Sequence, residues 1–219
     1  MREPKSYTIS ILKRVLPFYC RGLTLDVGAG SGKYAGLIKK YATDYIGFDN
    51  LSSARQFGDK VPAHIGFIGN VMNIPLKSGA AETVICSQVI EHVPEPGELM
   101  AELARVCKSN GHIFLATGWM APYHKEPLDY FRFSKDGFRH LFEKNGVEMI
   151  ELIPNGGVCT FLVWYPMRLI ELKSKWWRRK LGKIIRPLEL LAEWVDEKID
   201  TSDHSIGYFA VGRKTAKQP

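Results

Sequence analysis

The chain has 219 residues, of which 45% are hydrophobic, 24% charged and 11% aromatic. This is the composition of a globular protein with enough apolar side chain for a buried core, and it excludes a largely disordered chain. The formal net charge of +7 suits an RNA, an anionic membrane or an acidic small molecule as partner, and charge alone does not choose among them.

The four cysteines are scattered along the chain and form no C-x-x-C pair. The spacing of a zinc site is therefore missing, and a disulfide framework is not expected in a chain of this length. We predict reduced thiols in a cytoplasmic protein. Residues 1–7 are polar and lack the apolar core of a signal peptide.

Apolar runs alternate with helical patterns through the first three quarters of the chain. This alternation predicts an α/β fold with a mostly parallel sheet and helices on both faces. Residues 158–200 break the alternation and predict a helical insertion before the last strand. The predicted parts are a core over 1–157, a basic and aromatic appendage over 158–205 and a last core strand over 206–213. In chain order, we predict helix over 6–16, strand over 23–27, helix over 34–41, strands over 45–49, 65–68 and 83–87, helix over 97–106, strand over 112–117, helix over 138–145, and strands over 147–153 and 206–212.

A glycine-rich loop after the first predicted strand is the strongest signal, and residues 25–34 read LDVGAGSGKY. Glycines at alternate positions allow a tight turn and a close approach of a ligand to the backbone. Asp49 ends the next strand, 21 positions after Gly28, where a carboxylate can accept hydrogen bonds from a ribose diol. A dinucleotide fingerprint would place its third glycine at Lys33, so a nicotinamide dehydrogenase is disfavoured.

This loop resembles motif I of the class I S-adenosylmethionine-dependent methyltransferases. Residues 69–76, GNVMNIPL, are similar to the stretch after strand 3 that contacts adenine in that family. Residues 82–93, ETVICSQVIEHV, resemble the strand 4 motif of the type 11 methyltransferase domain, and residues 103–115 resemble the helix, turn and strand that follow. The ordered matches cover about residues 23–117.

The resemblance implies a Rossmann-like sheet of seven strands, one of them antiparallel near its end, and S-adenosylmethionine as cofactor. In the family the glycine loop approaches the methionine part, the acid after strand 2 binds the ribose, and the acid at the position of Asp26 helps to hold the loop and the amino group. Asn70 stands where the family commonly has Asp, and its amide oxygen can still accept from the adenine amino group. The residues expected to bind the cofactor are Asp26, Gly28, Ala29, Gly30, Gly32, Asp49, Asn50, Asn70, Val71, Ser87 and Gln88.

Methyl transfer from a sulfonium needs an aligned nucleophile and, for some acceptors, a base that removes its proton. His92 follows strand 4, and an imidazole with an ordinary pKa of about 6.5 can act as that base. The alternative is a histidine that is hydrogen-bonded to the loop backbone. No ligand spacing demands a metal, so none is predicted.

The loop over 118–134 follows strand 5 and is rich in aromatic and charged residues. A similar stretch occurs in type 11-like methyltransferases found near polysaccharide genes. His124 in this loop is the first choice of base. The alternative is a lid packed on aromatic side chains, with a local ion pair in it. The residues expected to contact the substrate are Trp119, Tyr123, Asp129, Tyr130 and Arg132.

The appendage combines apolar, aromatic and basic segments. Residues 158–172 are apolar and aromatic, but Pro166 and Arg168 interrupt the run, which is too short to span a bilayer. Residues 173–186 carry many cations, no acid and two adjacent tryptophans. Three interpretations stay open: a helical cap over the active site with a solvated basic face, a contact with an anionic membrane, and an RNA-binding surface.

These patterns favour methyl transfer from S-adenosylmethionine to a small-molecule acceptor, with an oxygen of a sugar-containing or lipid-linked metabolite as the preferred target. The first alternative is an RNA methyltransferase acting on tRNA, because the chain is basic and a Gly-Lys-Tyr sequence follows motif I in some tRNA-modifying enzymes. The second is a non-catalytic cofactor-binding module that recruits a partner through the appendage.

Overall fold

The computed structural model describes residues 7–51, 61–123, 128–173, 175–199 and 202–216, with the backbone alone over 167–186. Its centre is one seven-stranded sheet in the order β3-β2-β1-β4-β5-β7-β6. β7 runs antiparallel to both of its neighbours, and the other pairs are parallel. The strands are β1 (Leu23–Val27), β2 (Asp44–Asp49), β3 (Ile65–Ile68), β4 (Ala81–Ser87), β5 (Cys107–Gly118), β6 (Val147–Asn155) and β7 (Gly207–Lys214). The predicted mostly parallel seven-stranded sheet is confirmed.

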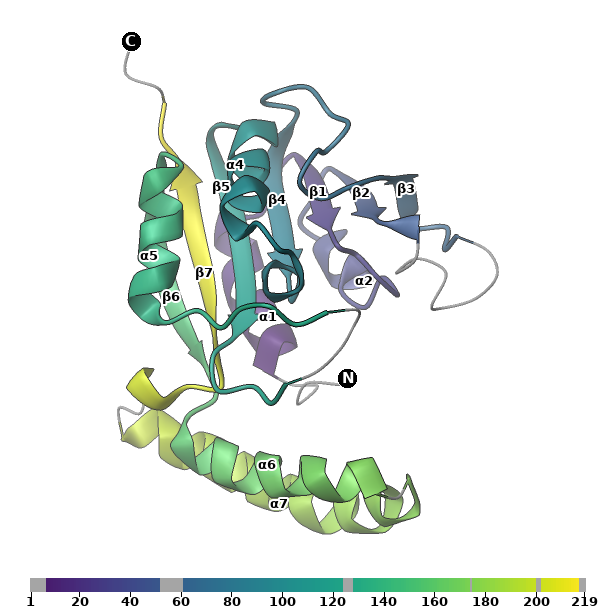
Figure 1. Ribbon diagram of the computed structural model, residues 1–219, viewed down its shortest axis with the longest axis vertical. Helices are drawn as coiled ribbons and strands as arrows, with labels where there is room; N and C mark the ends of the chain where they lie inside the picture. The colour runs from purple at the N-terminus through teal and green to yellow at the C-terminus, as the bar shows by residue number, and fades with distance from the viewer. Residues whose placement is uncertain (1–6, 52–60, 124–127, 174, 200–201, 217–219) are drawn as a thin grey trace.

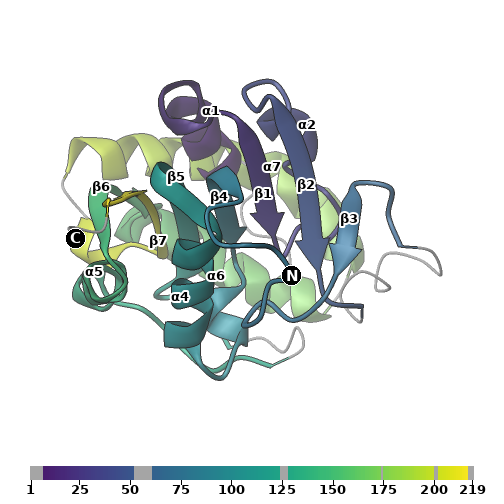
Figure 2. The ribbon, with the colours of Figure 1, turned by 90° about the horizontal axis from the view of Figure 1, so that it is seen from above.

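Helices cover both faces of this sheet, as predicted (Figures 1 and 2). On one face, α4 (Pro96–Val106) and α5 (Lys135–Lys144) pack on an apolar cluster that includes Val84 and Leu115. On the other face, α1 (Tyr7–Tyr19) packs on a cluster that includes Phe114, and α2 (Ala35–Ile38) adds Ile38 to the same cluster. Because the central strands are buried on both sides, they read as nearly continuous apolar runs.

Local sequence explains where the two helices of the first face begin. α4 has Pro96 in its first turn, where the missing N–H is not needed and the fixed φ is already helical. α5 is capped by Ser134, whose Oγ accepts a hydrogen bond from the Gly137 amide at 3.2 Å. The apolar residues of both helices then recur on the side that faces the sheet.

A helical hairpin stands between β6 and β7, which confirms the predicted insertion; the predicted domain boundaries stay a prediction. Its helices α6 (Val158–Lys173) and α7 (Lys175–Lys198) lie side by side and cross the side of the molecule at which the parallel strands end (Figure 1). No helix of the described residues is both long and apolar enough to cross a bilayer.

One carboxylate fastens the base of this hairpin. Asp196 of α7 accepts hydrogen bonds from the amides of Gly157, Cys159 and Thr160 at 3.1, 3.0 and 2.8 Å, and from the Thr160 hydroxyl at 2.6 Å. These amides open α6 and would otherwise lack acceptors. The Thr160 hydroxyl also lies 2.8 Å from the hydroxyl of Tyr7, which ties the hairpin to α1.

Candidate active site

Four adjacent strands bring the residues expected to bind the cofactor to one edge of the sheet. The glycine loop follows β1, Asp49 ends β2, Asn70 and Val71 follow β3, and Ser87 ends β4. Because these strands are parallel, their carboxyl ends meet at the same edge, where open α/β sheets bind ligands. The fold therefore brings together segments that are up to 60 positions apart in the sequence.

The glycine loop is bonded directly to the end of β2. Asp49 is 3% exposed, and its carboxylate accepts the amide hydrogens of Gly30 and Asn50, both at 2.7 Å. Burial raises the pKa of Asp49, and these two amides and the nearby His64 counteract that rise. The acid expected to bind a ribose thus also sets the shape of the loop.

Two of the glycines are required by close packing and by backbone conformation. Gly28 has φ +76°, and a Cβ there would lie 2.2 Å from Cγ2 of Val89. Gly32 has φ +70°, and a Cβ there would lie 2.7 Å from the ring of His64. His64 also places its Nε2 3.0 Å from the carbonyl oxygen of Gly30. His64 is a site residue that the sequence did not reveal, because nothing in its neighbourhood marks it as a partner of a loop 32 positions away.

Asp26 is a second buried acid at this edge. It is 3% exposed and accepts a hydrogen bond from the Tyr45 hydroxyl at 2.8 Å. Burial raises the pKa of Asp26 to about 6, the tyrosine lowers it, and the negative charge of Asp49 raises it further. Two desolvated carboxylates on neighbouring strands favour a ligand that carries positive charge. Tyr45, the partner of Asp26, was not expected from the sequence.

The segment after β3 is held by α4. Asn70 is exposed, and its Oδ1 accepts the Met72 amide at 3.0 Å in a local turn. Arg105 donates to the carbonyl oxygens of Ile74 and Leu76 at 2.8 and 2.7 Å. Glu102, the ion-pair partner of Arg105, accepts the Ile74 amide at 2.8 Å. This pair of helical residues holds the predicted adenine-contacting stretch in place, and no sequence pattern indicated the contact.

The end of β4 carries backbone strain and an unsatisfied hydroxyl. Gln88 has φ +59°, a conformation that non-glycine residues rarely adopt, and its amide donates to Ala116 at 2.8 Å. The Oγ of Ser87 is buried and has no hydrogen-bond partner among the described residues. Strain and orphaned polar atoms cluster at ligand sites, which fits the predicted role of both residues in cofactor binding.

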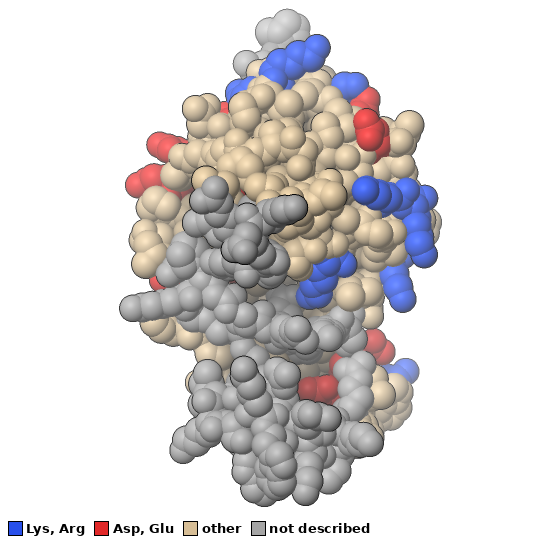
Figure 3. Space-filling model, turned by 90° about the vertical axis from the view of Figure 1, so that its right-hand side faces the viewer, with Lys and Arg blue, Asp and Glu red and all other residues tan. Residues whose placement is uncertain are grey.

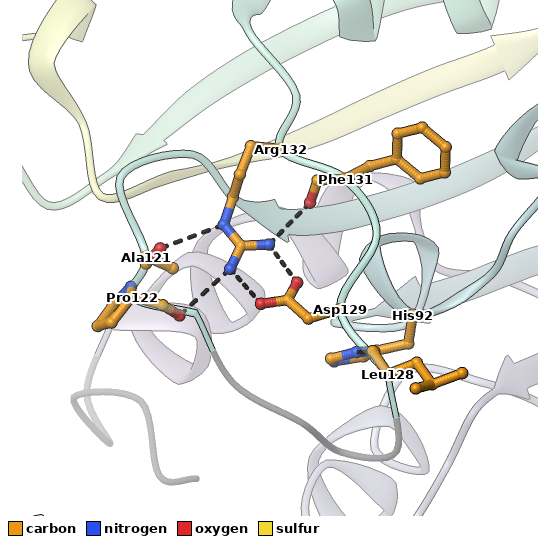
Figure 4. A network of polar contacts seen from close by, with 7 residues as sticks. All are labelled: His92, Ala121, Pro122, Leu128, Asp129, Phe131 and Arg132. Carbon is orange, nitrogen blue, oxygen red and sulfur yellow. Dashed lines mark hydrogen bonds and ion pairs between the residues drawn. The ribbon is translucent and has the colours of Figure 1, made fainter.

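Arg132 holds the loop after β5 together (Figure 4). Its guanidinium makes a bidentate ion pair with the carboxylate of Asp129. It also donates hydrogen bonds to the carbonyl oxygens of Ala121, Pro122 and Phe131 at 3.1, 3.2 and 2.8 Å. A guanidinium has five N–H donors, and these contacts use five. The side chain of Asp129 is 1% exposed. The ion pair predicted as the alternative is present, and the pair is positioned to shape the loop.

His92 is fastened to the same loop. Its Nδ1 lies 2.5 Å from the carbonyl oxygen of Leu128 (Figure 4). A carbonyl oxygen only accepts, so Nδ1 carries the proton, and in the neutral ring Nε2 carries the lone pair. The hydrogen bond to the loop backbone predicted as the alternative is therefore present, and it fixes the tautomer that a base acting through Nε2 requires.

The aromatic residues of the loop divide by exposure. Tyr123 and Tyr130 are 68% and 46% exposed, so their rings are open to a ligand. Trp119 is partly buried against the main apolar cluster. Phe131 and Phe133 continue as a chain of ring contacts at centroid distances of 6.0 and 5.9 Å into α5, which anchors the loop on the core. His124 lies outside the described residues, so its role as base stays a prediction.

Comparison with known proteins finds a family model that matches part of the chain. Residues 25–115 match the family model described as a methyltransferase domain. An uncharacterized methyltransferase of Mycobacterium ulcerans (strain Agy99) is 32% identical over 115 residues, which cover 49% of this chain and 44% of that protein. The chain thus matches less than half the length of this curated relative.

Two solved structures share the fold. A SAM dependent methyltransferase from Archaeoglobus fulgidus has a TM-score of 0.63 at 16% identity, with 94% of this chain and 93% of that chain covered. Phosphoethanolamine N-methyltransferase 2 of Haemonchus contortus, solved with S-adenosyl-L-methionine, has a TM-score of 0.60 at 16% identity, with 95% and 52% covered. Residues 25–115 thus resemble a methyltransferase domain, and the chain as a whole shares its fold with these two solved structures.

Proposed function

We propose that the protein transfers a methyl group from S-adenosylmethionine to an oxygen of a small molecule, a sugar-containing or lipid-linked metabolite. The observation that carries the cofactor assignment is the pair of buried acids, Asp26 and Asp49, beside a loop whose glycines have positive φ. S-adenosylmethionine offers two cationic groups and a ribose diol, and two desolvated carboxylates match these groups.

The residues present fit this cofactor in detail. Asp49 can accept from ribose hydroxyls through lone pairs that the amides of Gly30 and Asn50 do not use. Asp26 loses the cost of its buried charge when a cation comes close to it. The buried Ser87 hydroxyl gains a partner if the loop moves slightly on binding. When bound, the cofactor supplies the electrophilic methyl and the leaving group, and the protein supplies alignment.

The acceptor class rests on the loop after β5. Exposed tyrosine rings pack well on sugar rings or acyl chains, and Tyr123 and Tyr130 are both exposed in the loop that follows β5. Asp129 and Arg132 use their groups within the loop, so we assign them to positioning these rings. Trp119 supports the loop from the core side. The Haemonchus enzyme methylates phosphoethanolamine by its name, and a small-molecule acceptor for this chain is consistent with that neighbour.

We assign the proton transfer to His92, with its Nδ1 fixed by the Leu128 carbonyl and Nε2 as the base. A base contributes roughly 100- to 10,000-fold to the rate. His92→Asn separates this role from positioning, because the asparagine amide can donate to the same carbonyl but cannot take a proton. We expect a loss of at least about 100-fold in kcat, unchanged KM and no acidic limb in the pH profile. Near-normal kcat would reduce His92 to a positioning residue.

The overall proposal is tested with methyl-labelled S-adenosylmethionine and cell extract separated into lipids, polar metabolites, RNA and protein. We expect label in the lipid or polar fraction with the wild-type protein and none with Asp49→Ala. The matched control is Asp44→Ala, an exposed acid at the opposite end of β2, which should transfer label normally. Label in RNA would overturn the acceptor class, and label in no fraction would favour a non-catalytic module.

A further inference from the structure

α7 presents large apolar side chains to solvent. Leu188, Leu191 and Trp194 recur at helical spacing and are 49%, 56% and 56% exposed. Ala192 of the same helix is 6% exposed, and Asp196 bonds to α6. A surface helix normally turns its apolar stripe to the core, so an outward stripe marks a contact with something outside the chain.

The same hairpin carries a dense cationic segment where α6 ends and α7 begins. Two adjacent tryptophans, Trp176 and Trp177, stand within it, and residues 173–186 contain no acid. Acidic residues return only in the second half of α7, near the base of the hairpin. The cations of this segment are Lys173, Lys175, Arg178, Arg179, Lys180, Lys183 and Arg186.

The placement of the hairpin adds to this pattern. It crosses the side of the molecule at which the parallel strands end, so it lies on the same side as the candidate active site (Figure 1). Lysine and arginine side chains also gather along one side of the core in the view of Figure 3. The net charge of +7 attracts the whole protein to an anionic surface.

We propose that the hairpin docks on the surface of an anionic lipid bilayer. The exposed Leu188, Leu191 and Trp194 enter the interfacial layer, and the positive charge of residues 173–186 attracts the anionic headgroups. A nucleic acid would use the cations and aromatic rings, but leucine has no face on which a base stacks. The exposed leucines therefore favour lipid over RNA. Docking brings the ligand edge of the sheet close to the bilayer.

The experiment is sedimentation of the full chain with vesicles of phosphatidylcholine and phosphatidylglycerol at a molar ratio of about 3:1, and with pure phosphatidylcholine, at low and high salt. One variant removes three positive charges from the cationic segment of residues 173–186: Arg178→Gln, Arg179→Gln and Lys180→Gln. A second removes exposed apolar surface: Leu191→Gln and Trp194→Gln. The control for the charge variant is the triple substitution Lys13→Gln, Lys40→Gln and Lys77→Gln, at three exposed lysines outside the hairpin. The control for the apolar variant is Phe18→Gln, at a phenylalanine of α1 that is 78% exposed.

We expect the wild-type protein to sediment with the anionic vesicles at low salt and to be released from them by high salt. It should not sediment with the neutral vesicles. Each hairpin variant should bind at least about tenfold more weakly, and each control within about twofold of wild type. Equal melting temperatures show that the variants fold.

Failure of the wild-type protein to bind, equal binding to neutral vesicles, or equal losses in the controls would overturn the proposal. So would binding to tRNA that depends on the same hairpin residues without binding to vesicles. Vesicle binding does not require methyl transfer, so this result stands apart from the proposed activity.

Discussion

Two buried acids dominate the energetics of the site at the scale of single residues. Asp26 and Asp49 are each 3% exposed, and burial raises the pKa of both. Burying charged carboxylates in this environment lowers the stability of the folded protein, and such losses are common at functional sites. We expect a ligand that brings positive charge and hydroxyl donors to these two acids to offset this cost.

Asp26 gives a pH-dependent stability with a defined sign. Its pKa rises to about 6 in the folded protein, so its favourable contribution is full below its ordinary value near 3.8 and is lost as pH rises through about 6. Asp26→Asn keeps an acceptor for Tyr45 and removes the titration. In thermal melts from pH 4 to pH 8, the free energy of unfolding of the variant should increase relative to that of the wild type as pH rises, by at most about 3 kcal/mol. Parallel curves for the two proteins would contradict the raised pKa.

Gly28 is required by its neighbour Val89 as well as by its φ of +76°. Gly28→Ala should lower the free energy of unfolding by about 1–3 kcal/mol and weaken cofactor binding, because the new methyl group overlaps the valine and the backbone is strained. The double variant Gly28→Ala with Val89→Ala should recover only the part of the lost free energy of unfolding that comes from the steric overlap, and not the part that comes from the strained backbone. Denaturant unfolding of both variants measures these free energies. An equal loss of unfolding free energy in the two variants would show that the clash with Val89 contributes nothing.

At the scale of elements, helices position the loops of the candidate site. α4 holds the 70–76 segment through Glu102 and Arg105, α7 caps α6 through Asp196, and η1 (Ile90–His92) holds the 118–134 loop through His92. The first and third of these contacts join a regular element to a loop, so each of the two loops has a defined shape before any ligand arrives.

Arg105→Met should weaken cofactor binding without unfolding the protein. The variant loses two hydrogen bonds to the 70–76 backbone but keeps an unbranched side chain of similar length. We expect the Kd for S-adenosylmethionine to rise at least about tenfold, because a hydrogen bond to a charged group contributes roughly 1.5–3 kcal/mol. Arg139→Met, at an exposed position of α5, is the control. Calorimetric titration decides between them, and an unchanged Kd for Arg105→Met would contradict the positioning role.

Asp196 controls the base of the hairpin. Burial acts to raise the pKa of Asp196, but the Thr160 and Cys159 donors lower it overall, so its contribution to stability is present at neutral pH and is lost in acid. Asp196→Ala should speed hydrogen exchange at the amides of Cys159 and Thr160 by about tenfold, in line with the loss of a helix cap. Glu197→Ala, an exposed neighbour, should leave that exchange unchanged. Equal exchange in the two variants would contradict the cap.

At the scale of the whole molecule, the sequence predicted the sheet because its buried strands read as apolar runs between helical patterns. The start of β5 was missed, since Lys108, Ser109 and Asn110 are exposed and polar yet belong to the strand. The ligand edge was predictable because parallel strands place their carboxyl ends together. Contacts across long sequence separations, such as Tyr45 with Asp26 and Arg105 with Ile74, depend on packing that no local pattern encodes.

The central claim is that Asp26, Asp49 and the glycine loop form a site for S-adenosylmethionine. Calorimetric titration of the full chain with S-adenosylmethionine tests it most directly, with Asp49→Ala as the site variant and Asp44→Ala as the matched control. We predict saturable binding by the wild type and the control, and a loss of at least about tenfold in affinity for Asp49→Ala, because a ribose hydroxyl loses a charged acceptor. Absence of binding by the folded wild-type protein, or equal affinity in Asp49→Ala, would contradict the account.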